Sequence, residues 1–444
     1  EPIRISAMED AAEDASKAKA STTIGKLLSE FLVGVQNAHQ EEIDCYLREV
    51  QNKIAADGDQ RLTELPIIEQ SINKKISDLF PGIEVKLHFP VPNFSDLFKA
   101  GTVRVYENGS IGRNFSSYGH GTQRSIQMAL VRHLAEVKKS ASASTNTTLL
   151  LIDEPELYLH PFAIEQIREA LKALIAVGYQ VIFSTHSSQM VTSRDTKNSL
   201  LIRKTSSRGT HSRKRLSDAI QNVLPDAIHQ LEQIFSPEHS GQVLFADRVV
   251  LVEGKTERRL LPCIYRAVTD KTLGQDRIAL VTQTGVTDTK KSMQILQYMD
   301  LPVKAIVDLD YVMMHGRNDG FIQDKDPDVL ALIGILASLA NSGQIAVDPV
   351  TGLAQKKNGV SASAAYALMA KQTSAANPID SLHSKLLTQN IWVWKRGAVE
   401  DHLGLSRKEE RHWAAFEEKL SGPHGMSICT DRNSVETLVK WLLK

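Results

Sequence analysis

Four acidic residues follow two apolar segments of the chain, where they could together bind metal ions. In "VVLVEGKTE", Glu253 ends an apolar run and Glu257 comes four residues later, on the same side of the following turn or helix. In "AIVDLDY", Asp308 and Asp310 end a second run, and the two-residue period of a strand would point both side chains the same way. Converging carboxylates repel one another unless divalent cations neutralise them. Oxygen ligands favour Mg²⁺ or Mn²⁺ over Zn²⁺, and the alternative is a set of solvent-facing acids.

A third segment, "WKRGAVED", adds polar residues that could complete a two-metal site. Glu400, and less clearly Asp401, could reach a second ion, and Lys395 could face a scissile phosphate as a charge stabiliser. In a two-metal mechanism one ion activates a water molecule and the other stabilises the leaving oxygen. The sequence does not separate a general-base role of Glu253 from a role as metal ligand.

The segment "LLLIDEPELYLHP" places Asp153 and Glu154 at the end of another apolar run. Such a run suits a parallel strand buried on both faces, and ligands of these sheets bind beyond the carboxyl ends of the strands. The acids therefore stand where phosphate and metal chemistry takes place. Alternatively, Asp153 caps the helix that begins near Pro161 and Glu154 faces water.

Two further segments could form a phosphate site with these acids. In "SYGHGTQRSIQMAL", Gly119 and Gly121 precede a helix whose free N–H groups and dipole favour an anion, and "VIFSTHS" places His186 after a strand. Each signal alone is also typical of an ordinary turn or of a structural histidine.

The elements that position these residues alternate between helix and strand, which predicts an α/β fold with parallel sheets. Apolar spacing predicts helices over about 22–56 and 62–79, either at a dimer interface or covering a sheet. Strands are expected at 83–89 and 101–109, and the following segments should alternate as helix 119–137, strand 147–153, helix 162–176, strand 179–186 and strand 199–204. A second α/β pattern begins near 247 and carries an Ala-rich helical insertion at about 327–387.

A basic stretch separates the two α/β patterns. It contains Arg203, Lys204, Arg208, Arg213, Lys214 and Arg215, and residues 205–215 have the composition of an exposed turn or loop. DNA backbone contacts are one interpretation and a merely solvated loop is the other.

The composition favours a large multidomain protein in a reducing compartment. The 444 residues exceed one ordinary core, and the 52 basic residues balance the 52 acidic ones, so net charge indicates no partner. Cys45, Cys263 and Cys429 lack metal-ligand spacing, and no secretory or membrane-spanning run is present. We therefore expect a cytoplasmic protein without membrane contact; a prokaryotic origin is what the resemblance described next implies.

The order glycine turn, Asp-Glu strand and His strand resembles the ABC-type ATPases, in the branch that includes SMC proteins and the OLD (overcoming lysogenisation defect) nucleases. The resemblance implies that Gly119, Gly121, Gln123 and Arg124 form the signature motif. It also implies that Asp153 holds Mg²⁺ as the Walker B acid, that Glu154 polarises the attacking water and that His186 is the switch histidine.

The order E-G-x-T-E, "QTG" at Gly285 and D-L-D resembles the Toprim domain of topoisomerases, primases and OLD nucleases. Asp308 and Asp310 match its metal acids and Glu253 its leading glutamate. An ABC-type head followed by Toprim resembles the OLD family in particular. We thus expect a helical dimerisation insert at 1–80, the later part of an ABC-type head at 81–240 and a Toprim domain at 241–444.

The resemblance implies a homodimer that nicks or cleaves DNA with Mg²⁺ or Mn²⁺ under the control of ATP, often in antiphage defence and sometimes beside a helicase-like partner. An SMC-like DNA clamp with an inert Toprim domain is the alternative, and a topoisomerase is disfavoured because no tyrosine can be assigned. The P-loop pattern G-x-x-x-x-G-K-[ST] does not occur. We expect either a missing N-terminal lobe or a degenerate head that does not hydrolyse ATP.

Overall fold

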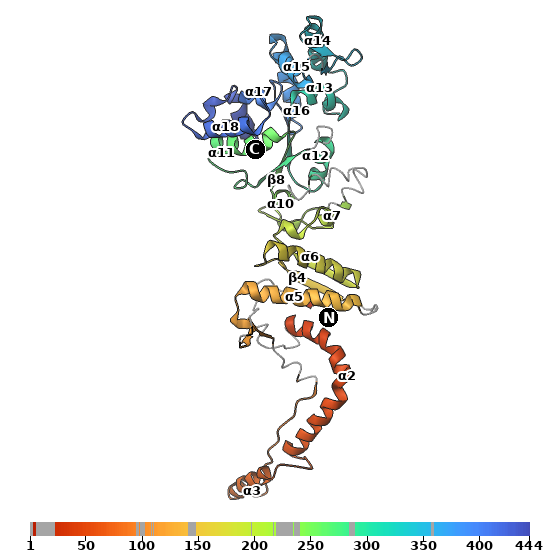
Figure 1. The fold of residues 1–444 in the computed structure, drawn as a ribbon, viewed down its shortest axis with the longest axis vertical. Helices are drawn as coiled ribbons and strands as arrows, with labels where there is room; N and C mark the ends of the chain where they lie inside the picture. Colours follow the sequence, from red (N-terminus) through yellow and green to blue (C-terminus); the bar gives the residue numbers. More distant parts are fainter. Residues whose placement is uncertain are drawn as a thin grey trace. The chain divides into compact units, whose positions relative to one another are not determined.

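The computed structural model divides the chain into two compact units, Glu1–Met190 and Val191–Lys444 (Figure 1). It describes residues 3–5, 23–94, 97, 103–107, 109, 111–140, 148–196, 198–215, 217–218, 234, 240–283, 289–356 and 359–444. The division falls about fifty residues before the domain boundary expected at 240. The reason is that Val191 and Leu201 pack against the core of the second unit.

The first unit is built on a three-stranded parallel sheet with the order β1-β4-β5. Its strands are β1 (Ile3–Ile5), β4 (Thr148–Asp153) and β5 (Tyr179–Ser184). Helices α5 (His120–Ser140) and α6 (Pro161–Ala176) contact one another beside β4 (Figure 1). The predicted helices and strands of this segment are confirmed, whereas β1 is an element that the sequence patterns did not indicate.

The two predicted helices lie in the chain between β1 and the rest of this α/β part: α2 (Thr23–Ile54) and α3 (Glu64–Ser77). The prediction of a strand at 83–89 is wrong. Side chains of α3 form the hydrogen bonds with the backbone of this segment that a neighbouring strand would otherwise form. Glu69 accepts from the Leu87 N–H, and Asn73 bonds both the N–H and the carbonyl of Val85. Among the described residues of the strand predicted at 101–109, only Arg104–Val105 form a strand, β2. It pairs antiparallel with β3 (Arg113–Asn114) ahead of the short helix η1 (Phe115–Ser117).

The second unit contains a four-stranded parallel sheet with the order β13-β10-β8-β9. The strands are β8 (Arg248–Val252), β9 (Ile278–Thr282), β10 (Val303–Val307) and β13 (Ile391–Val393). Their side chains are almost all buried, and they divide between two apolar clusters, one on each face. Continuous apolar strands therefore identified this sheet correctly.

Helices and the insertion cover the two faces of this sheet. One cluster includes residues of α12 (Thr289–Tyr298), α13 (Leu309–Asn318), α14 (Pro327–Asn341), α15 (Ala362–Ala370) and α16 (Ala376–Leu387). The insertion, helix-rich as predicted, also holds the hairpin β11 (Ala346–Val347) and β12 (Ala354–Gln355) and the turn η4 (Thr373–Ala375). The other cluster includes residues of α11 (Lys255–Thr269), α17 (Val399–Leu403), α18 (Glu410–Ser421), η5 (Gly425–Ile428) and α19 (Arg432–Leu443).

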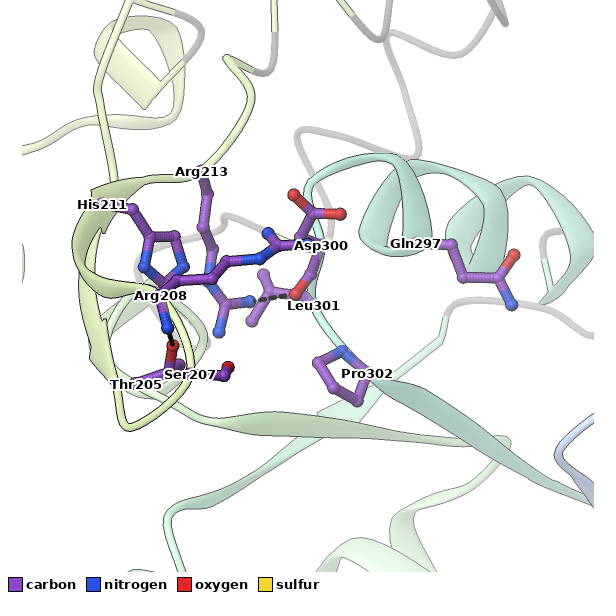
Figure 2. Close-up of a pocket in the computed structure, with 9 residues that line it drawn as sticks. All are labelled: Thr205, Ser207, Arg208, His211, Arg213, Gln297, Asp300, Leu301 and Pro302. Carbon is purple, nitrogen blue, oxygen red and sulfur yellow. Dashed lines mark hydrogen bonds between the residues drawn. The ribbon is translucent and has the colours of Figure 1, made fainter.

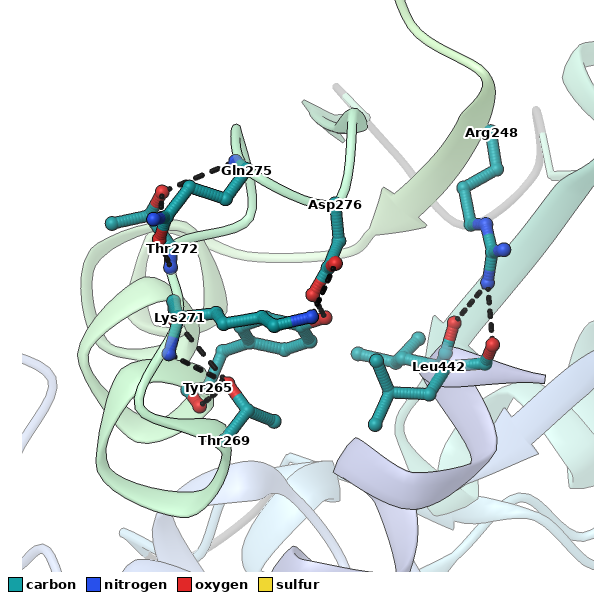
Figure 3. Close-up of polar contacts among 9 residues, drawn as sticks. Arg248, Tyr265, Thr269, Lys271, Thr272, Gln275, Asp276 and Leu442 are labelled. Carbon is teal, nitrogen blue, oxygen red and sulfur yellow. Dashed lines mark hydrogen bonds and ion pairs between the residues drawn. The ribbon is translucent and has the colours of Figure 1, made fainter.

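Polar contacts fasten the sheet to its covering helices. The Arg248 guanidinium donates to the carbonyls of Leu442 and Leu443 at 2.8 and 2.9 Å, so the start of β8 binds the end of α19 (Figure 3). Tyr265 of α11 donates to Asp276 at 2.6 Å, ahead of β9 (Figure 3). These contacts fix α11, which carries Glu257, relative to the strands.

The strand predicted at 199–204 does not join a parallel sheet, and residues 205–215 are not merely a loop. Strand β6 (Ile202–Thr205) pairs antiparallel with β7 (Gly209–Ser212), and Gly209, directly after the connecting turn, has a φ of 66°. The Arg203 guanidinium donates to the carbonyls of Leu244 and Ala246, which ties this hairpin to the second unit.

Short helices complete the described elements: η2 (Ser188–Met190), α7 (Ser193–Thr196) and α10 (Ser240–Val243). Within the described ranges, none of the helices combines the length and the apolar character of a membrane span.

Candidate active site

Three of the predicted acids converge at one edge of the second sheet. Glu253 follows β8 and Asp308 follows β10, and these strands are parallel neighbours with Val252 opposite Ile306. One carboxylate oxygen from each of Glu253, Asp308 and Asp310 lies within 4.8 Å of the others. The parallel register therefore brings together residues that are more than fifty positions apart.

The geometry that aligns Asp308 with Asp310 differs from the one expected. Strand β10 ends at Val307, so Asp308 is the N-cap of α13 and Asp310 lies in its first turn. The two side chains converge through a strand-to-helix turn and not through the two-residue period of a strand. The turn is held where the Leu309 N–H donates to the Gly397 carbonyl at 2.8 Å.

Burial and mutual repulsion perturb these acids. Burial, together with the charge of Asp310, raises the pKa of Glu253 to about 7. Burial and the charges of Glu257 and Glu253 raise the pKa of Asp308 well above its usual range, and burial also raises the pKa of Asp310. The Oδ1 atoms of Asp308 and Asp310 are buried without a hydrogen-bond partner. Buried, clustered and unpartnered oxygens fit a hard divalent cation.

Glu257 and Glu400 form a second acidic group beside the first. Glu257 is buried in the first turn of α11, where burial and then the charge of Glu400 raise its pKa to about 7. A Cβ at position 254 would lie 2.9 Å from Glu257 Oε2, so the glycine of E-G-x-T-E gives this carboxylate its space. Glu400 is buried in α17 and accepts from Thr256 Oγ1 at 2.5 Å.

A basic residue that sequence reasoning missed stands among these acids. Lys408 Nζ lies 3.2 Å from Glu400 Oε2, and its charge lowers the pKa of Glu253, Glu257 and Asp308. Burial acts to lower the pKa of Lys408 itself, but the carboxylates of Glu400 and Asp308 outweigh burial and raise it. No motif could have identified Lys408, because it follows α17 in a charged segment with no diagnostic spacing.

Two residues of "WKRGAVED" lie elsewhere than expected. Lys395 Nζ is 2.8 Å from Asp380 Oδ1 of the insertion, in an exposed ion pair. Asp401 accepts from the Ala398 N–H at 3.1 Å and so caps α17. Gly285 lies outside the described residues.

In the first unit, the predicted acids and His186 also lie together. His186 Nε2 is 3.4 Å from Glu154 Oε1, and Asp153 accepts a hydrogen bond from the Ser184 hydroxyl of the neighbouring strand. The N-cap of α6 is His160, so Asp153 does not cap that helix. Glu154 has a φ of 44°, which turns its backbone sharply at the end of β4.

The residues predicted to form the signature motif lie in the same unit, and one of them binds the end of β4. The buried Arg124 guanidinium donates to the carbonyls of Asp153 and Glu154 at 2.7 and 2.6 Å, and Gln123 donates to the Tyr118 carbonyl at 2.7 Å. Gly119 and Gly121 stand at the beginning of α5. A role of these four residues in binding nucleotide stays a prediction.

Two family models match the two parts of the chain. Residues 7–191 match an AAA ATPase domain, and residues 244–310 match the TOPRIM domain described as overcoming lysogenization defect protein-like. Together with the acid cluster at the sheet edge, these matches define the class of protein: an enzyme that joins an ATPase domain to a Toprim domain.

Over 451 residues the chain is 34% identical to the Old nuclease of Escherichia phage P2, and the match covers 100% of this chain and 76% of that protein. The chain therefore belongs to the OLD (overcoming lysogenization defect) family of nucleases. It is a hydrolase with an associated ATPase domain, and a nuclease implies DNA as substrate. Domains of these two kinds generally use a divalent metal and a nucleotide.

One solved structure, the crystal structure of Stu0660 of Streptococcus thermophilus, matches 53% of this chain and 63% of its own chain at 12% identity and a TM-score of 0.33. A TM-score of this size does not indicate a shared fold.

Proposed function

We propose that the chain is a metal-dependent DNA endonuclease or nickase whose Toprim domain cleaves phosphodiester bonds with Mg²⁺ or Mn²⁺. The observation that carries the proposal is the convergence of the partly buried Glu253 and Asp310 with the buried Asp308, where one carboxylate oxygen of each lies within 4.8 Å of the others. Without a cation this arrangement is repulsive, so its presence favours a metal site over a set of solvent-facing acids.

In the proposed mechanism, Glu253, Asp308 and Asp310 would hold one ion, and Glu257 and Glu400 would hold a second. Bound divalent ions would activate the attacking water and stabilise the leaving oxygen. The Thr256 hydroxyl orients Glu400, and Gly254 leaves room for Glu257. Glu253 serves as a ligand, and it is also placed to accept the proton of the attacking water.

Lys408 is the better placed of two candidate charge stabilisers for the scissile phosphate. Its ammonium group already contacts the acidic cluster through Glu400, whereas Lys395 pairs with Asp380 at the surface. When cations neutralise the carboxylates, Lys408 is free to bind a phosphate oxygen as a point charge.

We further propose that the ATPase unit regulates cutting. Asp153 would hold the nucleotide-bound Mg²⁺, Glu154 would polarise the attacking water and His186, paired with Glu154, would sense the γ-phosphate. The resemblance to OLD nucleases supports ATP as the nucleotide, a role in antiphage defence and a helicase-like partner.

The nuclease proposal is tested with supercoiled plasmid and the purified chain. We expect nicked circles with Mn²⁺ or Mg²⁺ and intact supercoils in EDTA, because the acids need a bound cation to act on a phosphodiester. Wild-type protein that binds plasmid but never nicks it in either metal would sink the proposal and would favour a DNA-clamping ATPase with an inert Toprim domain.

Homodimerisation through α2 and α3 is a separate proposal. It is supported by exposed apolar side chains on α3 and on the residues that directly follow α3. Ile67, Leu79 and Phe80 are 64%, 75% and 63% exposed, as expected of a surface that a second copy covers. Changing Ile67 and Phe80 to aspartate should convert a dimer into a monomer in light scattering after size exclusion. Gln70→Asp, on an exposed position of α3, is the matched control and should remain dimeric. A double variant that keeps the dimer mass would contradict this interface.

A further inference from the structure

A pocket of about 560 Å³ lies in the second unit between the β6–β7 hairpin and the connection from α12 to β10 (Figure 2). It is lined by Thr205, Ser207, Arg208, His211, Arg213, Gln297, Asp300, Leu301 and Pro302. None of these residues belongs to the acidic cluster, so the pocket is a separate feature of the domain.

The lining is rich in groups that bind anions. Arg208, His211 and Arg213 project from the hairpin, and the Ser207 hydroxyl lies beside them (Figure 2). Guanidinium groups stay charged and offer several donors in one plane, which suits phosphate oxygens. Asp300 is the one acid among the nine lining residues. The exposed Lys204, Lys214 and Arg215 add positive charge along the same hairpin.

The hairpin backbone is held in place, so the hairpin stands beside the pocket before any ligand arrives. The Arg213 guanidinium donates to the Asp300 carbonyl at 2.5 Å (Figure 2), and the Lys214 ammonium lies 4.8 Å from the centre of the Tyr298 ring. At the turn, the Arg208 N–H donates to Thr205 Oγ1 at 3.2 Å. Arg213 is thus partly a structural residue, whereas the Arg208 side chain is exposed.

The pocket lies at the end of β10 opposite the catalytic edge. Pro302 precedes β10 and Asp308 follows it. At about 3.3 Å per residue, the strand separates them by roughly 20 Å. Along the axis of a DNA duplex, roughly 20 Å corresponds to about six base pairs at 3.4 Å each. A ligand in the pocket therefore does not occupy the cutting site, but a DNA strand could reach both.

We propose that this pocket binds backbone phosphates of the DNA substrate about six nucleotides from the cut and so anchors the duplex on the Toprim domain. This inference rests on the proposed nuclease function and adds a specific binding site to it. The pocket reads no sequence, because the contacts are made to phosphate groups. Asp300 opposes the bound phosphate and limits the affinity.

The test measures binding of a fluorescent duplex of about thirty base pairs in EDTA, which prevents cutting, over 50 to 200 mM salt. Arg208→Glu should weaken binding by about tenfold and reduce the salt slope by about one. Asp300→Asn should tighten binding, because it removes the opposing charge but keeps the carbonyl that Arg213 needs. Asparagine also tolerates the positive φ of 55° at this position.

Lys371→Glu, an exposed charge reversal after α15, is the matched control and should leave both affinity and slope unchanged. Unchanged binding by Arg208→Glu, or an equal loss in Lys371→Glu, would overturn the proposal. The proposal would also be overturned if ATP competed with the duplex for binding and Arg208→Glu abolished that competition. The pocket would then be a site for free nucleotide.

Cutting assays separate this inference from the nuclease proposal. Arg208→Glu should nick plasmid more slowly, yet cut a hairpin duplex of about four base pairs at the wild-type rate, because about four base pairs at 3.4 Å each are shorter than the roughly 20 Å from the cut to the pocket. Equal slowing on both substrates would overturn the anchoring role. If wild type cuts neither substrate while Arg208→Glu still loses duplex affinity, the nuclease proposal fails and the phosphate site stands.

Discussion

Replacing Asp308 with asparagine is expected to reduce metal-dependent nicking by about a thousandfold while DNA affinity changes little. Asp308 is buried, carries an unpartnered Oδ1 and has a carboxylate oxygen within 4.8 Å of those of Glu253 and Asp310. Asparagine keeps the shape of the side chain and its N-cap position but removes the charge that holds a cation. The rate of conversion of supercoiled to nicked plasmid at saturating Mn²⁺ measures the effect.

The matched control for this substitution is Glu418→Gln, which removes a carboxylate from an exposed position of α18. It should nick at the wild-type rate. An Asp308→Asn protein that nicks as fast as wild type would show that these acids do not hold the catalytic metal. Loss of folding is monitored by circular dichroism, so that inactivity caused by unfolding is not mistaken for loss of the metal.

The second large effect concerns stability without metal. Glu257 has an ordinary pKa of 4.5 and a folded-state pKa of about 7 because it is buried near Glu400. Between these values the folded protein holds a proton that the unfolded chain releases, so raising the pH through this window favours unfolding. At pH 8, without metal, Glu257→Gln should therefore be more stable than wild type by on the order of 3 kcal/mol, or roughly 5–10 °C in melting temperature.

At pH 5 the two proteins should melt within a few degrees of each other, because Glu257 is then largely protonated in wild type. Buried His383 and His402, whose pKa values burial lowers to about 4, change stability in the opposite direction but equally in both proteins. Millimolar Mn²⁺ should remove the advantage of the variant at pH 8. A variant less stable than wild type at pH 8 in EDTA would refute this account of the buried acids.

The two substitutions act on one cluster in different ways. Asp308→Asn measures how much the carboxylates contribute to the rate of DNA cleavage. Glu257→Gln measures how much their mutual repulsion lowers the stability of the folded protein. Function and stability are expected to oppose each other here, because carboxylates placed for cations repel one another when the cations are absent.

Much of the fold was predictable because local patterns carry it. Continuous apolar runs indicated the strands β4, β5, β8, β9, β10 and β13, and helical spacing indicated α2, α3, α5 and α6. The prediction failed at residues 83–89, which alternate as a strand does but bond to the side chains of Glu69 and Asn73. Strand β1 is three residues long and depends on its pairing with β4, so no periodicity could identify it.

Some residues of the candidate site could also be predicted from the sequence, whereas others could not. Glu253, Glu257, Asp308 and Asp310 were identified from their positions after apolar runs, although Asp310 reaches the cluster from the first turn of α13 and not from a strand. Lys408 could not be identified, because only packing brings a lysine after α17 against Glu400. Likewise, the pairing of Lys395 with Asp380 depends on where the insertion packs.

By itself the sequence indicated which residues are candidates for binding metal and nucleotide and where along the chain the strands that carry them lie, because side-chain chemistry and backbone periodicity are local properties. Only the tertiary structure decided which oxygens lie within 4.8 Å of one another, which lysine neutralises them and how the β6–β7 hairpin forms a basic pocket. Those properties depend on strand register and helix packing between residues far apart in the chain, and the burial that raises the pKa values of the acids exists only once that packing is complete.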